Sequence, residues 1–216
     1  MSDYLRPIVE RFEPIDHMTP NDEEFQQALP EDPDVEEINE ARRDLTTSKE
    51  RGGAVLTIKI LAELLHLSEE VRTRINEIED SPVTEWDGEK KDDVHLFFTF
   101  VGQTQEYLLR EAVVKYVISE TATTDAMKQK IMGGENEVGW SAKMCIDYLH
   151  RADVIGDGFK GEIYQTRNER NETVHDITRW FFANFDPEDL RAQVSRSERS
   201  VVRLLEITYG FELEDN

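Results

Sequence analysis

The amino-acid sequence predicts an all-α protein. Apolar residues recur at three- and four-residue intervals along most of the chain after residue 53, which is the spacing of one helix face. Only residues 94–101, which are rich in aromatic and β-branched side chains, could instead form a strand. No internal repeat is visible. Five helical stretches are predicted at about residues 54–79, 94–119, 140–154, 163–185 and 188–209.

The first two stretches carry regular apolar stripes. Gly52-Gly53 is expected to break the chain before the first stretch, and Ser81-Pro82 marks the loop after it. The first stretch can be one helix or two consecutive ones. The stripe residues are Leu61, Leu64, Val71, Ile75 and Ile78 in the first stretch, and Phe97, Val101, Leu108, Ala112 and Tyr116 in the second.

Glycine and proline bound the later stretches. Pro187 stops the fourth stretch, and Gly210 ends the fifth. The third and fourth are separated by Gly156-x-Gly158-x-x-Gly161, which matches the dinucleotide-binding fingerprint. That fingerprint requires a preceding strand within a βαβ unit, whereas the residues before Gly156 have helical spacing. We therefore interpret the three glycines as a tight turn between two helices.

The chain divides into three predicted regions. Residues 1–50 hold five of the seven prolines and are expected to form an irregular acidic arm, with a helix at about 33–45. Residues 51–93 are expected to form a helical or winged-helix-like region. Residues 94–212 are expected to form a helical bundle.

Residues 61–78 have two interpretations. They fit one long helix that packs against the next stretch as a helical hairpin. They also fit a helix-turn-helix with a recognition helix at 71–75 and a wing at 83–86 and 94–100, which would make the protein a DNA-binding regulator. The hairpin is favoured because the segment is acidic, whereas DNA binding needs Lys and Arg to neutralise phosphates.

The composition indicates an ordered protein. The 216 residues can bury a substantial core, and 38% hydrophobic with 9% aromatic residues argues against a disordered chain. No apolar run approaches the ~18 residues of a membrane span, and the first residues are not a signal peptide. The single cysteine, Cys145, excludes an intrachain disulfide and lies on an apolar stripe. We expect a cytoplasmic protein, no membrane attachment and Cys145 in the core.

The net charge of −22 results from 47 acidic and 25 basic residues. Such an excess of carboxylates is typical of halophilic proteins, because the Debye length falls to ~3 Å at 1 M salt. The alternative is a protein that mimics nucleic acid or binds a basic partner. Under the halophilic interpretation, the negative charge does not exclude an RNA or DNA substrate.

The histidines do not predict a metal site. No two of them share metal-ligand spacing with an acidic partner on one helical face, so we expect no metal. The five are His17, His66, His95, His150 and His175.

Two arginines interrupt the apolar stripe of the fourth stretch. At ~100° per residue, Arg167 and Arg170 fall in the same sector of roughly 80° as Ile163 and Val174. A desolvated guanidinium is costly unless it has an anionic partner. That partner is predicted to be either a carboxylate, such as that of Asp147, or a phosphate.

Polar side chains with catalytic potential flank these arginines. Asn171 and His175 are four residues apart and share a helix face. Arginine binds phosphate through paired hydrogen bonds, and histidine can act as a general acid or base near neutral pH. The sequence Arg170-Asn171-x-x-Val174-His175 resembles the signature of the HEPN superfamily, and the resemblance covers about residues 94–212.

The resemblance implies a bundle of four or five helices and a metal-independent endoribonuclease without a cofactor. Many family members are toxins or defence effectors, so an antitoxin protein is an implied partner beside the RNA substrate and the second copy of a homodimer. Arg170 and His175 would be the catalytic pair, with Asn171 supporting them. The pair is about 140° apart on a straight helix, so a kink or the second subunit must unite them. Other members are non-catalytic RNA- or protein-binding modules, which is the alternative.

The fifth stretch carries a basic face. Arg196, Arg199 and Arg203 lie within roughly 60° of each other, opposite the apolar side. These arginines, with Arg167, are predicted to bind the RNA backbone beside the motif. The alternative is a solvated face neutralised by Glu198 and Glu206.

Overall fold

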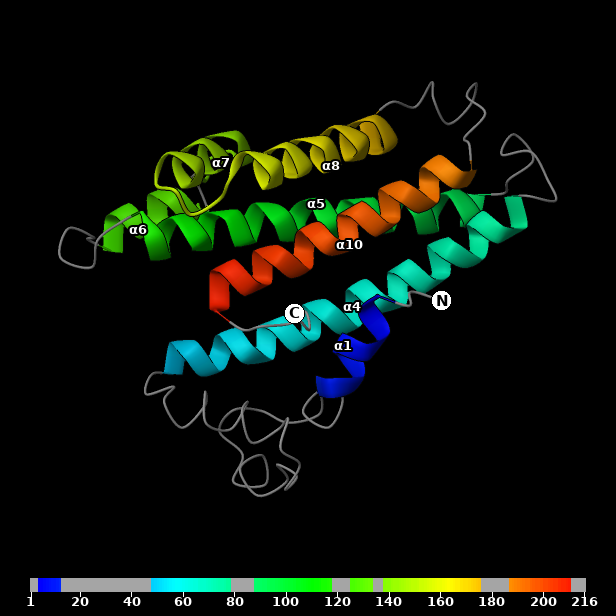
Figure 1. Cartoon of the computed structure of the whole chain (residues 1–216), viewed down its shortest axis with the longest axis horizontal. Coiled ribbons are helices and arrows are strands. Elements are labelled where there is room, and N and C mark those ends of the chain that lie inside the picture. The colour runs from blue at the N-terminus through cyan, green and yellow to red at the C-terminus, as the bar shows by residue number, and fades with distance from the viewer. Residues whose placement is uncertain are drawn as a thin grey trace, which may run out of the picture.

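The computed structural model describes residues 4–12, 48–78, 88–117, 125–133, 138–175 and 187–210. This part of the chain contains helices and no strand, which confirms the all-α prediction (Figure 1). None of its helices is long and apolar enough to cross a membrane. The helices are α1 (Leu5–Phe12), α4 (Ser48–Ile78), α5 (Gly88–Tyr116), α6 (Asp125–Met132), α7 (Ala142–Arg151), α8 (Asp157–His175) and α10 (Pro187–Tyr209).

Helix α10 is the centre of the bundle. It packs against α4 on one side and against α5 and α8 on the other (Figure 1). At 31 and 29 residues, α4 and α5 each extend for about 45 Å. The shorter helices cover these long ones, since α1 packs on α4, while α6 and α7 pack on α5.

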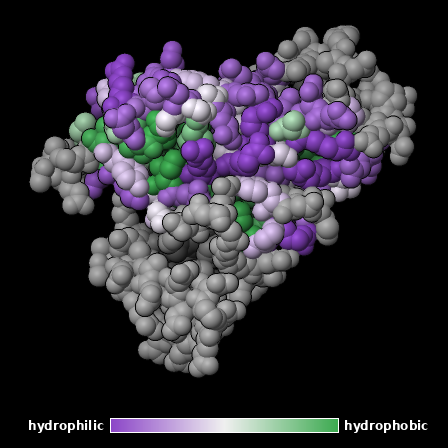
Figure 2. Space-filling view, viewed as in Figure 1, coloured by the Kyte–Doolittle hydropathy of each residue, from purple (hydrophilic) through white to green (hydrophobic). Residues whose placement is uncertain are grey.

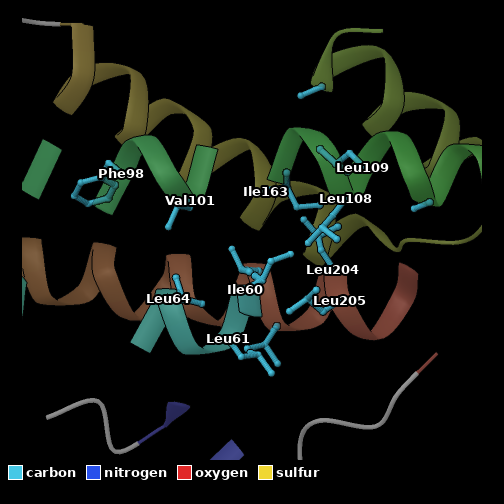
Figure 3. Packing of buried hydrophobic residues seen from close by; sticks show 14 of the residues in the cluster. Ile60, Leu61, Leu64, Phe98, Val101, Leu108, Leu109, Ile163, Leu204 and Leu205 are labelled. Carbon is cyan, nitrogen blue, oxygen red and sulfur yellow. The ribbon is translucent and has the colours of Figure 1, made fainter. Parts of the chain in front are cut away.

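The core lies where α4, α5, α8 and α10 face one another. Figure 3 shows Leu108 of α5, Ile163 of α8 and Leu204 of α10 close together in the interior, and these three residues and Leu61 of α4 are fully buried. The predicted stripes of α4 and α5 therefore supply core residues. Tyr116, at the end of α5, is instead exposed, and the side chain of Ile78 lies outside the described part of the structure.

Helices α4 and α5 form the predicted hairpin, and the winged-helix interpretation is wrong. α4 is continuous through Leu67-Ser68, the proposed turn. Residues 94–100, the proposed second wing strand, lie inside α5, and residues 83–86 are outside the described part. The long helix prevails because Leu64, Val71 and Ile75 are all buried on one continuous face.

The N-terminal region differs from its prediction at two places. Residues 5–12 form α1 rather than part of an irregular arm, because Leu5 and Ile8 are buried against the core. α4 begins at Ser48, so Gly52-Gly53 does not break the chain. The helix expected at about 33–45 lies outside the described residues.

The connections of α7, α8 and α10 use specific capping residues. Ser141 caps α7, since its side chain accepts a hydrogen bond from the Met144 backbone N–H. The predicted helix-to-helix turn after α7 is present but ends earlier than expected, because Gly158 and Gly161 belong to α8. α10 ends at Tyr209 and is followed by Gly210, whose φ of 79° favours glycine.

The described surface is mostly hydrophilic. Figure 2 shows purple residues over most of the described part of this face, and its largest green area lies near α6 and α7. Large apolar side chains are exposed on and beside these two helices, namely those of Met127, Val138, Met144 and Tyr148. This end of the bundle therefore offers an apolar surface that the described residues do not cover.

Candidate functional site

The motif residues lie in the last turns of α8, whose buried face is more polar than expected. Phe159 and Ile163 are buried, and so are Thr166 and Thr173. The buried face therefore runs through the threonines toward Arg170, and Arg167 lies at its edge. The observed buried face differs from the predicted apolar stripe because it includes threonines. A threonine can be buried since its hydroxyl can bond within the helix, as that of Thr166 does to the Ile163 carbonyl at 3.0 Å.

Arg170 is half-buried between α8 and α5. Its Nη1 donates a hydrogen bond to the Oδ1 of Asn171 at 3.1 Å, which places the two motif residues in direct contact. Its Nε is buried and has no hydrogen-bond partner. Within the described part of the chain, no carboxylate pairs with this guanidinium.

The carboxylate expected to neutralise the motif arginines is engaged elsewhere. Asp147 forms an ion pair with Lys160 at 3.2 Å and accepts a hydrogen bond from the Tyr164 hydroxyl at 3.3 Å. The hydrogen bond from Lys160 lowers the pKa of Asp147. Asp147, the example of a carboxylate partner for Arg167 or Arg170, is therefore paired with Lys160 instead. Arg167 is half-buried and has no acidic partner among the described residues.

A buried glutamine holds α5, α8 and α10 together beside the motif. The Nε2 of Gln105 donates to the Thr166 hydroxyl at 3.0 Å and to the Ser200 hydroxyl at 2.9 Å. Gln105 is 1% exposed. We did not predict this contact, although Gln105 lies at helical spacing between the core residues Val101 and Leu108. The sequence feature that could have indicated this contact is a polar residue at a core position of the helix.

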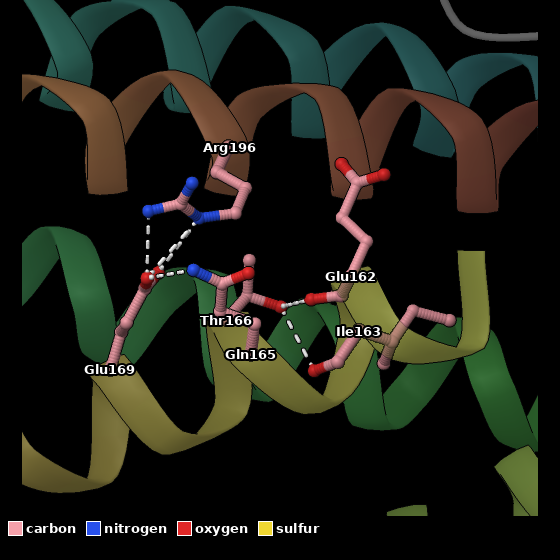
Figure 4. Close-up of polar contacts among 6 residues, drawn as sticks. All are labelled: Glu162, Ile163, Gln165, Thr166, Glu169 and Arg196. Carbon is pink, nitrogen blue, oxygen red and sulfur yellow. Dashed lines mark hydrogen bonds and ion pairs between the residues drawn. The ribbon is translucent and has the colours of Figure 1, made fainter. Parts of the chain in front are cut away.

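Arg196 connects α10 to α8 through an acidic residue beside the motif. Figure 4 shows its guanidinium facing Glu169, with an Nη2–Oε1 distance of 2.8 Å. The same carboxylate accepts a hydrogen bond from Gln165 at 3.1 Å. The pair is largely buried, with side-chain exposures of 24% for Arg196 and 12% for Glu169. Arg196 is therefore not a solvated cation.

The other two arginines of the basic face have different surroundings. Arg203 is exposed, and its guanidinium carbon lies 4.4 Å from the centre of the Phe159 ring. Arg199 is exposed and has no ion pair within the described residues. Glu198, expected to neutralise this face, instead pairs with Arg72 of α4 at 2.9 Å and is fully buried. That expectation is wrong because Glu198 points into the bundle.

The proposed acid–base residue, His175, is the last residue of α8. Its side chain, like that of Val174, is outside the described part of the structure. The backbone of α8 is helical from Arg170 to His175, so the two residues remain about 140° apart by helical count.

The remaining reactive residues have structural surroundings. Cys145 is fully buried, which confirms a core position, and burial raises the pKa of its thiol to about 11. His150 contacts Asp157 at 2.8 Å. No three His, Cys, Asp or Glu side chains of the described chain form a group that could hold a metal ion.

The comparisons with known proteins add no assignment to this site. Neither the family models, the curated proteins nor the solved structures contain a match to the chain.

Proposed function

We propose that the protein is a HEPN-type, metal-independent endoribonuclease that acts as a homodimer. The observation that carries the proposal is Arg170, a half-buried cation without a carboxylate partner in the described part of a chain whose net charge is −22. By contrast, Arg72 and Arg196 each have an acidic partner. A phosphodiester would supply the missing charge through paired hydrogen bonds.

The proposed reaction uses the ribose 2′-hydroxyl as the nucleophile. His175 takes the proton of this hydroxyl, and the oxygen attacks the adjacent phosphorus. A bond from the 2′-oxygen to phosphorus forms while the bond to the 5′-oxygen breaks, and the leaving oxygen receives a proton from water. Arg170 stabilises the charge that develops on the phosphoryl oxygens, and Asn171 orients its guanidinium. The products are a 2′,3′-cyclic phosphate and a 5′-hydroxyl.

The helical geometry supports the proposal of a dimer. By helical count Arg170 and His175 are about 140° apart on α8, so one straight helix is not expected to direct both at the same phosphate. A twofold dimer that apposes two α8 helices would combine Arg170 of one subunit with His175 of the other.

RNA cleavage at several molar KCl with EDTA tests the proposal. We expect His175→Ala to lower the cleavage rate by about 10²–10⁴-fold and Arg170→Ala by about 10²–10³-fold, the usual losses of an acid–base residue and of a charge-stabilising donor. His95→Ala is the matched control, because His95 is exposed on α5. Equal activity of His175→Ala and wild type would contradict the mechanism.

The basic face of α10 is proposed to bind the RNA backbone. We expect Arg196→Glu with Arg199→Glu to weaken RNA binding and to reduce the log–log salt slope by ~0.7 for each lost phosphate contact. Because Glu169 already neutralises Arg196, the single variant Arg199→Glu should account for most of the loss. Arg151→Glu, an exposed arginine on α7, is the control. Unaltered affinity in the double variant would leave these arginines with a structural role.

The same resemblance extends the proposal to a toxin or defence effector that an antitoxin protein restrains. Expression of the wild-type chain should then slow growth of the host cell, whereas expression of His175→Ala should not.

A second candidate is a non-catalytic helical module that binds another protein. The observation that favours it is the exposed apolar surface on and beside α6 and α7, where Val138 between the two helices is 96% exposed and Met144 of α7 is 43% exposed. Cleavage activity that survives Met144→Asp but disappears in His175→Ala would favour the nuclease over this candidate.

A further inference from the structure

Gly102 is a buried glycine in the interior of α5, the helix that faces the motif. Glycine lowers helix stability because its backbone loses more freedom on folding than that of any other residue. Here its missing side chain has a consequence for Arg170. A Cβ at residue 102 would lie 2.7 Å from the Nε of Arg170 and 3.2 Å from its Cδ and Cζ. The observed position of the guanidinium therefore requires glycine.

The Arg170 side chain is buried at its Nε and hydrogen-bonded at its Nη1. The Nη1 donates to Asn171 at 3.1 Å. Within the described residues, no hydrogen bond occupies Nη2. Partial burial also strengthens the attraction of the guanidinium for an anion, because the local dielectric constant is lower than that of water.

The backbones on both sides are fixed by Gln105. It lies one turn after Gly102 on α5 and bonds to Thr166, one turn before Arg170 on α8, at 3.0 Å. The second hydrogen bond of Gln105, to Ser200 of α10 at 2.9 Å, also fixes the position of α5 along α10. A side chain at residue 102 would therefore displace the flexible end of Arg170 rather than shift the helices.

We propose that Gly102 is a positioning residue, whose missing side chain forms the seat that holds the Arg170 guanidinium for a phosphodiester. This inference rests on the proposed function. It assigns a role in the reaction to a residue of α5, which lies 68 positions before the motif arginine in the sequence.

The test compares Gly102→Ala with Gly161→Ala. Gly161 is a matched control, because it lies in α8 and a Cβ there would meet no atom within 4 Å. The first measurement is the rate at which phenylglyoxal modifies Arg170, read by mass spectrometry, with the exposed Arg199 as an internal reference. The second is the kcat of RNA cleavage by the full-length protein in high salt, and the third is the melting temperature.

We expect Gly102→Ala to raise the modification rate of Arg170 several-fold relative to Arg199 and to lower kcat at least tenfold. Its melting temperature should equal or exceed that of the wild type, since alanine favours the helix. Gly161→Ala should change neither Arg170 modification nor kcat. A purely structural role of Gly102 would instead lower the melting temperature.

If the modification rate of Arg170 is unchanged in Gly102→Ala, Gly102 does not hold the guanidinium in place. If the modification is faster but kcat is unchanged, Gly102 does not position Arg170 for the reaction. If Gly102→Ala does not fold, the wild type still tests the seat, because modification of Arg170 as fast as that of Arg199 contradicts it. Failure of the proposed function is distinguishable, since it is seen as the absence of RNA cleavage by the wild type.

Discussion

Cys145 shows how complete burial alters the chemistry of a single side chain. The thiol is inaccessible on α7, and desolvation raises its pKa from 9.0 to about 11, while the nearby charge of Arg110 opposes the increase. Because a thiolate is the reactive form, the thiol is protected by both its burial and its protonation. We therefore assign Cys145 a packing role.

This pKa predicts a loss of stability at high pH. Below pH 9 the thiol is protonated in the folded and unfolded states, and its contribution is fully present. As the pH rises from 9 toward 11, the unfolded state releases this proton more readily, so the free energy of unfolding falls by up to about 3 kcal/mol. Urea unfolding of wild type and Cys145→Ala between about pH 8 and about pH 11 measures the effect. A parallel decline in the two proteins would contradict it.

At the scale of elements, the contact between α4 and α10 contains a buried charge pair. The Nη2 of Arg72 lies 2.9 Å from the Oε2 of Glu198 and donates a second hydrogen bond to Ser195 at 2.9 Å. Glu198 has no exposed side-chain surface, and Arg72 has 17%. Such a pair specifies how the two helices meet, because either charge alone would be costly to bury.

Removal of one partner should therefore destabilise the bundle strongly. We expect Arg72→Ala to lower the free energy of unfolding by about 3–5 kcal/mol, because it leaves Glu198 buried and unpaired. The double variant Arg72→Met with Glu198→Leu should recover most of that loss. Urea denaturation measures both, with Arg199→Ala on α10 as a surface control expected within about 0.5 kcal/mol of wild type. A loss in Arg72→Ala no larger than in the control would show that the pair is unimportant.

At the scale of the whole molecule, the net charge of −22 governs stability through mutual repulsion. The repulsion is weakly screened in dilute buffer, because the Debye length falls from ~10 Å at 0.1 M salt to ~3 Å at 1 M. We expect the melting temperature to rise between about 0.1 M and 2 M KCl, a range that spans this fall. Calorimetry or circular dichroism measures it, and a flat or falling melting temperature would contradict halophilic adaptation.

The assembly state is a second property of the whole molecule. Arg167 and Arg170 are half-buried without acidic partners in the described chain, which suits an interface that shares an anion between subunits. We expect light scattering in high salt to give twice the chain mass of 25.1 kDa. A monomer at tens of micromolar would oppose both the dimer and the ribonuclease proposal.

The sequence alone determined the helical class and most of the core. Leu61, Leu64, Phe97 and Leu108 could be assigned to the interior because a helix repeats every 3.6 residues, a property of the local chain. The glycine at 210 could be read as a helix end for a similar local reason. The motif of the candidate site was also visible, since Arg170, Asn171 and His175 lie close together in the sequence.

Only the tertiary structure decided which charges meet and which cations have no acidic partner among the described residues. Glu169 pairs with Arg196, and Asp147 pairs with Lys160, because helix packing and rotation select the nearest opposite charge. Periodicity places a residue on a face but does not say what lies across from it. The seat of Arg170 on Gly102 depends on the register between α5 and α8, which no local pattern encodes.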